Sequence, residues 1–304
     1  MQLEAGQAIV FSMVTATTAI MSTSHASVGE LLRRWRERRR LSQLALALDA
    51  DVSTRHLSFL ESGRARPSRD MLLRLMEHLD VPLRERNRLL LAAGYAPAFP
   101  ERCLDDPALQ PARQAVERVL AAHKPYPAHA VDRYWTLVAT NDVAWPLLEW
   151  VDPGLLEPPI NVLRLSLHPE GLAPRIANLG QWRAHILHRV RQQVESSGDP
   201  ALEALLTELA GYPAPGDEGT ETPLRDLYET GVVVPLRLCS TWGMLALFST
   251  VTIFGTPVDV TLSELAIEAF FPADPATAET LRRIAEDTTV RREPYRRRRP
   301  NRGA

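Results

Sequence analysis

The segment 41–68, LSQLALALDADVSTRHLSFLESGRARPS, restricts the fold more than any other part of the sequence. It predicts two helices of about eight residues joined by a very short turn, an arrangement that makes the helices cross at a steep angle. Ser42 and Ser53 stand where helix N-caps are required, Ala47 is small enough for close helix packing, and residues 50–52 supply the turn. The segment therefore predicts a helix-turn-helix, whose second helix presents outward side chains to the major groove of DNA.

Three further helices are expected around this pair. Residues 29–39 carry apolar side chains at helical spacing, and Pro67-Ser68 opens a helix that runs to about residue 79. Pro82 lies in the first turn of a fifth helix, which ends at Gly94. Residues 28–97 are thus expected to form an all-α, five-helix domain.

The segment resembles the Cro/phage-repressor-like (XRE-type) helix-turn-helix family. The positions that match the family pattern are Leu41, Ser42, Gln43, Leu46, Ala47, Val52, Ser53, Leu57, Ser58, Glu61, Gly63, Pro67 and Ser68. Family members usually carry Gly in the turn where this chain has Asp51, and Asp tolerates the left-handed backbone conformation better than most residues. The resemblance also implies a structural ion pair between Arg36 and Glu61.

The same resemblance implies DNA contacts for seven side chains. Thr54, Arg55 and Phe59 match base-reading positions: Arg55 suits the two acceptors of guanine and Phe59 the methyl group of thymine. Gln43 is expected to contact a phosphate at the start of the first motif helix. The remaining phosphate contacts are expected from His56, Arg64 and Arg66. Such contacts position the protein on the duplex but do not select a base sequence. For each Arg, an ordinary solvated surface charge is the alternative.

Four prolines in residues 96–111 indicate a Pro-rich linker, placed at 98–111, before a second domain at 112–287. Its pattern predicts helices at 112–122, 141–150, 161–167, 181–195 and 200–210, with two short strands in 128–139 around a turn at Asp132-Arg133. Strands are expected at 232–238 and 244–254, and a segment at 259–271 is expected to begin as a strand and end as a helix. This order is that of an α+β PAS-like domain, a sheet cupped by helices with a pocket between them.

Over residues 28–286 the chain resembles the MmyB-like transcription regulator family, whose C-terminal ligand-binding domain is PAS-like. The motifs that carry this resemblance lie in residues 125–128, 131–135, 161–171, 178–182, 254–261 and 264–268. The resemblance implies a homodimeric regulator that binds a double-stranded DNA operator and a small apolar, fatty-acyl ligand. The resemblance therefore implies that the chain is a multidomain, sequence-specific transcriptional regulator.

Aromatic residues spread over the second domain suit the lining of one apolar cavity, and an amphipathic ligand would also need polar partners for its head group. The side chains expected to contact the ligand are Trp135, Trp145, Arg164, His168, Asn178, Trp182 and Phe248. Arg164 or His168 is expected nearest the polar end. The alternative for each aromatic is an ordinary core position, and for the domain as a whole a protein-interaction module without a small ligand.

Other classes of function find no support in the sequence. Phosphate-loop, dinucleotide, zinc-protease and nucleophile-elbow motifs are missing, so neither an enzyme nor a cofactor is expected. The formal net charge of −2 requires any DNA-binding surface to be local. Two cysteines far apart suit a reducing, cytoplasmic setting, and no segment is apolar enough for a membrane span. Residues 1–27 and the basic stretch 288–304 are expected to be disordered.

Overall fold

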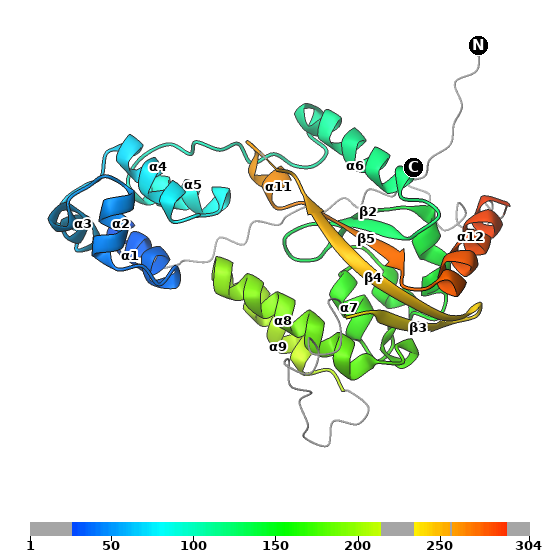
Figure 1. The fold of residues 1–304 in the computed structure, drawn as a ribbon. Helices are drawn as coiled ribbons and strands as arrows, with labels where there is room; N and C mark the ends of the chain where they lie inside the picture. The colour runs from blue at the N-terminus through cyan, green and yellow to red at the C-terminus, as the bar shows by residue number, and fades with distance from the viewer. Residues whose placement is uncertain (1–25, 214–233, 256, 291–304) are drawn as a thin grey trace, which may run out of the picture.

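The computed structural model describes residues 26–213, 234–255 and 257–290, which form two domains joined by an extended segment (Figure 1). The expected disordered extension and the basic tail fall almost entirely outside these residues, as does most of the segment between α9 and β3. Within the described residues, no helix is long and apolar enough to cross a membrane.

The N-terminal domain contains the five expected helices: α1 (Val28–Arg38), α2 (Gln43–Asp49), α3 (Thr54–Glu61), α4 (Arg69–His78) and α5 (Leu83–Ala92). The first four each begin after a serine whose hydroxyl accepts a backbone N–H of the first turn, namely Ser27, Ser42, Ser53 and Ser68. This satisfies one of the N–H groups that a helix start leaves unpaired. α5 instead follows Pro82, whose fixed φ suits a helix start.

The turn between α2 and α3 confirms the expectation for Asp51, which adopts a left-handed conformation with φ of 52°. The two helices pack through Leu46, Ala47, Leu57 and Leu60, none more than 1% exposed. α1 lies so close to the end of α3 that a β-carbon on Gly29 would collide with the carbonyl oxygen of Leu60. The fold of this domain is therefore fixed by short, individually capped helices around one apolar core.

The C-terminal domain is built on a five-stranded antiparallel sheet of spatial order β2-β1-β5-β4-β3. Its strands are β1 (Ala128–Val131), β2 (Leu137–Thr140), β3 (Leu236–Ser240), β4 (Gly243–Ile253) and β5 (Ala266–Pro272). The helices in the described part of the domain are α6 (Gln110–Ala122), α7 (Val162–Leu167), α8 (Leu179–Ser197), α9 (Pro200–Ala210), α11 (Val260–Ser263) and α12 (Pro275–Val290). The same residues also contain four 3₁₀ helices: Pro107–Leu109, Asp142–Leu148, Pro153–Leu156 and Ala173–Arg175.

The sheet separates two apolar layers. α6 packs on one face, against the small side chains of β1 and against Ile267 of β5. α7, α8 and α9 lie on the other face and share the larger core with β3 and β4 (Figure 1). This antiparallel sheet, with the larger core enclosed between it and α7, α8 and α9, is the α+β, PAS-like arrangement expected from the order of elements.

Two parts of the domain differ from the sequence expectation. Segment 259–271 was expected to begin as a strand and end as a helix, and the order is the reverse. The carboxylate of Asp259 accepts the N–H of Thr261 and starts the short helix α11, whereas the residues that follow pair with β1 and β4 as strand β5. In addition, the sequence expectation contained no helix at α12, which runs to Val290.

Candidate nucleic-acid interface and ligand cavity

The second helix of the motif, α3, carries the expected base-reading side chains, with Thr54 and Arg55 at its start and Phe59 in its second half. Arg55 is exposed, and its guanidinium lies 5.4 Å from the centre of the Phe59 ring. Thr54 and His56 are half-buried, and no acidic residue lies in the first turn of the helix. A helix start without carboxylates keeps its positive dipole end open to a phosphate.

The other residues expected to contact DNA precede and follow α3 along the chain. Arg64 and Arg66 are exposed in the segment that follows the helix. Gln43 is half-buried at the start of α2, and its amide donates to Glu61 Oε2 at 2.8 Å. Gln43 therefore has an internal partner as well as an exposed edge.

The expected ion pair between Arg36 and Glu61 is confirmed. Arg36 donates from Nε to Oε1 at 2.6 Å and from Nη2 to Oε2 at 2.8 Å, which makes the contact bidentate. A third nitrogen, Nη1, donates to the carbonyl of Leu41 at 2.8 Å. The side chains of Arg36 and Glu61 are 11% and 3% exposed, so the pair ties α1 to α3 inside the domain.

A mainly apolar cavity of about 120 Å³ lies in the C-terminal domain between the sheet and the helices α7 and α8. Its apolar lining includes Leu137, Leu163, Leu236, Leu238 and Leu247. Two of the expected ligand contacts, Trp145 and Trp182, also line it, and Trp182 Nε1 donates to Ser166 Oγ at 2.8 Å.

The other expected ligand residues lie outside this lining. Arg164 makes a bidentate ion pair with Glu208, with both distances 2.7 Å, and His168 packs edge-on against Tyr212. Asn178 holds the start of β3, since its amide donates to the carbonyl of Pro235 at 2.8 Å.

Two aromatic residues of the same set have structural partners. Trp135 is 8% exposed and its indole donates to Gln193 Oε1 at 2.9 Å. Phe248 stacks on Phe271 with ring centres 5.4 Å apart. The side-chain alternation of β4 directs Phe248 away from the face that carries Leu245 and Leu247.

The cavity lining also includes three ionisable side chains that were not among the expected ligand contacts: His129, Arg189 and Glu268. Arg189 Nη1 donates to Glu268 Oε1 at 2.8 Å, and Ser249 donates to the same oxygen at 2.9 Å. Burial of Glu268 opposes its ionisation, but His129 and Arg189 outweigh that effect and lower the pKa of the carboxyl to about 2. The cavity thus holds an ionised, paired carboxylate at its polar end.

Arg189 also reaches a second space between the two domains. Its guanidinium lies 4.5 Å from the centre of the Trp135 ring, and both residues line a more open cavity of about 490 Å³. Arg84 and Glu85 of α5 form the opposite wall of that cavity. Arg189 therefore borders both the apolar cavity and the space next to the helix-turn-helix domain.

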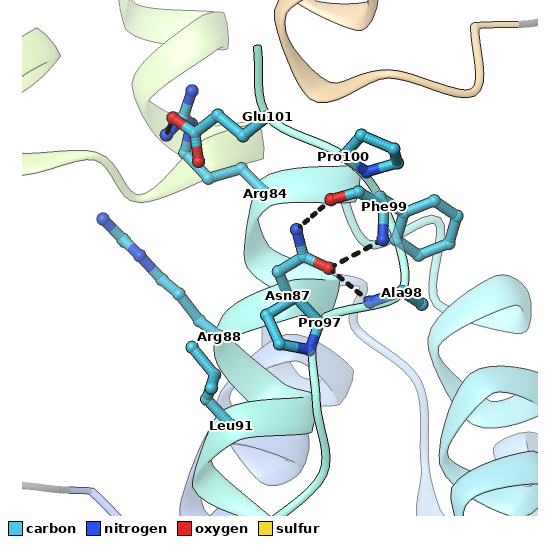
Figure 2. Close-up of a pocket in the computed structure, with 9 residues that line it drawn as sticks. All are labelled: Arg84, Asn87, Arg88, Leu91, Pro97, Ala98, Phe99, Pro100 and Glu101. Atoms are coloured by element: carbon cyan, nitrogen blue, oxygen red, sulfur yellow. Dashed lines mark hydrogen bonds and ion pairs between the residues drawn. The ribbon is translucent and has the colours of Figure 1, made fainter.

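The two domains are joined by ion pairs and by the segment that links them. Arg84 of α5 makes a bidentate contact with Glu264, at 2.8 and 2.9 Å, and also pairs with Glu101. Asn87 accepts the N–H groups of Ala98 and Phe99 and donates to the carbonyl of Phe99 (Figure 2).

The far end of this segment is held by the C-terminal domain. Val260 donates its backbone N–H to the carbonyl of Pro100 at 2.8 Å, and Arg102 pairs with Asp259 at 2.9 Å. The segment between the domains is therefore held at both ends, by Asn87 of α5 and by Asp259 and Val260 at the start of α11.

Comparison with known families assigns both domains. The model of the MmyB-like transcription regulator ligand binding domain matches residues 112–284. The chain belongs to this family of transcription regulators. A helix-turn-helix family model matches residues 32–86, so the chain is a DNA-binding transcription regulator with an MmyB-like ligand-binding domain. The family is one of regulators, not of enzymes.

Other comparisons add little. No curated protein matches the chain. One solved structure, that of an RNA-binding light-oxygen-voltage receptor, aligns at 13% identity with a TM-score of 0.22. The alignment covers 90% of this chain and 65% of the receptor chain.

Proposed function

We propose that this MmyB-like regulator binds a specific operator as a homodimer and changes its affinity for DNA when an apolar ligand of the fatty-acyl class occupies the cavity of its C-terminal domain. The observation that carries the proposal is the mainly apolar cavity, which lies inside the domain that the family uses for ligand binding. Such a cavity stabilises a ligand mainly through burial of apolar surface.

The cavity limits what fits without rearrangement. An apolar cavity of about 150 Å³ holds a molecule as large as benzene, so a cavity of about 120 Å³ holds a comparable body. A longer aliphatic chain requires lining side chains to move, and Trp145 is half-buried at the rim formed by the 3₁₀ helix Asp142–Leu148. Each buried methylene contributes about 0.8 kcal/mol, so affinity should rise with chain length until the cavity is full.

On the DNA side, Arg55 would read a guanine and Phe59 a thymine methyl, with Thr54 as the third base-reading residue. Gln43, His56, Arg64 and Arg66 would contact phosphates. A single short recognition helix reads few bases, so two copies are needed on half-sites about one helical turn apart. A footprint confined to one asymmetric half-site with a single chain bound would contradict the dimer.

The contacts of Arg84, Asn87 and Asp259 offer a route from the cavity to the DNA-binding domain. β5 carries Glu268 in the cavity lining and begins two residues after Glu264, the partner of Arg84. A ligand that shifts β5 would thus change how the helix-turn-helix domain is held. Coupling of this kind is reciprocal, so DNA must alter ligand affinity by the same factor.

The proposal is tested by calorimetric titration of the full chain with straight-chain amphiphiles of increasing length, alone and with an operator duplex selected from random sequence. Affinity that grows with chain length and changes on addition of the duplex supports it. No binding at any length would contradict ligand sensing and favour a protein-interaction role for the C-terminal domain.

Residues that fix the ligand's polar end are tested in the same way. Arg164 and His168 remain candidates, and Arg189 and His129 are added because they line the cavity. If binding is lost in Arg189→Met but kept in Arg164→Ala, the polar end lies at Arg189. The reverse result places it at Arg164.

A further inference from the structure

The apolar cavity and the cavity between the two domains lie on the same face of the sheet. His129 of β1 and Glu268 of β5 line the apolar cavity, whereas the next opposed pair on that face, Val131 and Ala266, lines the interdomain cavity. Side chains two residues apart on a strand project from one face. Among the described residues, Arg189 of α8 is the one that lines both cavities. The two cavities are therefore neighbouring parts of one trough between the sheet and α8.

Arg189 divides the two parts of the trough. It pairs with Glu268 through Nη1 at 2.8 Å, and its guanidinium lies 4.5 Å from the centre of the Trp135 ring on the interdomain side. The side chain is 22% exposed, and no described residue accepts a hydrogen bond from its Nε or Nη2. A guanidinium presents several donors in a fixed plane. Arg189 can therefore donate to a ligand carbonyl while it keeps its ion pair with Glu268.

The two parts of the trough differ in size. The apolar cavity, at about 120 Å³, holds a body comparable to benzene. The interdomain cavity, at about 490 Å³, lies within the range of roughly 300–1,000 Å³ that is usual for ligand sites. An acyl chain that fills the first cavity and whose carbonyl meets Arg189 directs the group attached to that carbonyl into the second.

The interdomain cavity suits an uncharged head group that can form hydrogen bonds. Its cations and anions already pair with one another: Arg84 lies 2.8 Å from Glu264, and Arg133 lies 3.5 Å from Asp199. A charged head group would have to separate such pairs, whereas a hydroxyl donates to a carboxylate and accepts from a guanidinium or an amide. Gln192 of α8 is exposed in this lining, and its amide makes no hydrogen bond with a described residue.

We propose that the trough binds an acyl chain whose carbonyl is joined to an uncharged, hydroxyl-bearing head group. The chain occupies the apolar cavity, the carbonyl accepts from Arg189, and the head group lies between the domains. This inference rests on the proposed ligand-sensing function and specifies the ligand class. Pro82, Arg84 and Glu85 belong to the start of the α5 region and form the opposite wall, so the head group contacts the DNA-binding domain directly. A free fatty acid reaches only as far as Arg189.

The test compares monodecanoylglycerol, methyl decanoate and decanoate, each titrated calorimetrically into the full chain below the concentration at which it aggregates. The glycerol ester should bind at least about tenfold more tightly than the methyl ester, which has the same chain and carbonyl but no hydroxyls; about two additional hydrogen bonds provide that factor. Equal affinities of the two esters, or binding of decanoate alone, would overturn this inference and leave the sensing function intact. If none of the three binds, the sensing function fails and the inference fails with it.

The variant Gln192→Trp fills the interdomain cavity from α8 and should abolish the preference for the glycerol ester over the methyl ester. The matched control, Gln114→Trp, makes the same change at an exposed position of α6 outside both linings, and should leave the preference unchanged. A preference that persists in a folded Gln192→Trp protein would overturn the placement of the head group.

A measurement on the unaltered chain decides if circular dichroism shows that Gln192→Trp does not fold. With each ester at saturating concentration, amide hydrogen exchange in α5 should be slower in the glycerol ester complex than in the methyl ester complex, because the head group covers the start of that helix. Equal exchange in the two complexes would overturn the inference.

Discussion

Arg36→Ala should destabilise the DNA-binding domain severely. The substitution removes three hydrogen bonds, two to Glu61 and one to the carbonyl of Leu41, from a site where the Glu61 side chain is 3% exposed. Glu61 would then be buried as a charge whose sole remaining side-chain partner among the described residues is the amide of Gln43. Losing one member of a buried ion pair costs about 3–5 kcal/mol.

That loss is large for a domain of this size. For a domain of about 60–100 residues, each kcal/mol corresponds to roughly 4–8 °C in melting temperature. Thermal unfolding of the fragment 26–102, followed by circular dichroism, should therefore show a fall of more than about 10 °C. The fragment retains the contacts of Asn87 with the linking segment.

Two controls separate the buried pair from general effects of lost charge. Arg33→Ala breaks an exposed contact with Glu37, whose two side chains are 63% and 50% exposed, and should change stability by at most about 0.5 kcal/mol. The double variant Arg36→Met/Glu61→Leu should recover much of the loss, because no unpaired charge remains. An unchanged melting temperature for Arg36→Ala would refute the reasoning.

Three further predictions follow from the described contacts. Arg55→Ala should relax the preference for one operator sequence, whereas Arg64→Ala should weaken binding to all sequences alike and lower the slope of log affinity against log salt concentration by about one. If both variants lost affinity uniformly across sequences, α3 would not be the helix that reads the bases. Gly29→Ala should lower the free energy of unfolding by about 1–3 kcal/mol, because its β-carbon meets backbone oxygens of α3, while Gly180→Ala, with open space around it, should not; equal urea midpoints would contradict this. Arg84→Ala should leave ligand affinity in the absence of DNA unchanged but reduce the factor by which ligand alters operator affinity; an unchanged factor would exclude the Glu264 contact as the link.

The DNA-binding domain could be predicted closely from sequence because its signals are local. Each of the first four helices begins after a serine cap, and the positive φ of Asp51 was expected because family members usually carry Gly at that position of the turn. The sequence expectation lacks the helix at Pro275–Val290, although Asp274-Pro275 is a typical helix start and the carboxylate of Asp274 accepts the N–H of Thr277.

The ligand cavity could be predicted only in part because it depends on long-range pairing. Trp145 and Trp182 line the cavity as expected, but the sequence does not reveal that Phe248 points to the opposite face of β4. Glu268 carries a recognisable signal, a charge within the apolar strand segment 266–271. Its partner Arg189 lies 79 residues away, a separation at which sequence patterns identify no contact.

The central claim, that occupancy of the cavity controls DNA binding, is tested most directly by the dissociation constant of a selected operator duplex, measured by fluorescence anisotropy as decanol is added to the full chain. The account predicts a saturable change in this constant, matched by an equal change in decanol affinity when the duplex is present. The change should disappear in Leu247→Trp, which fills the cavity from β4. A constant that stays the same while calorimetry shows decanol bound would contradict the claim.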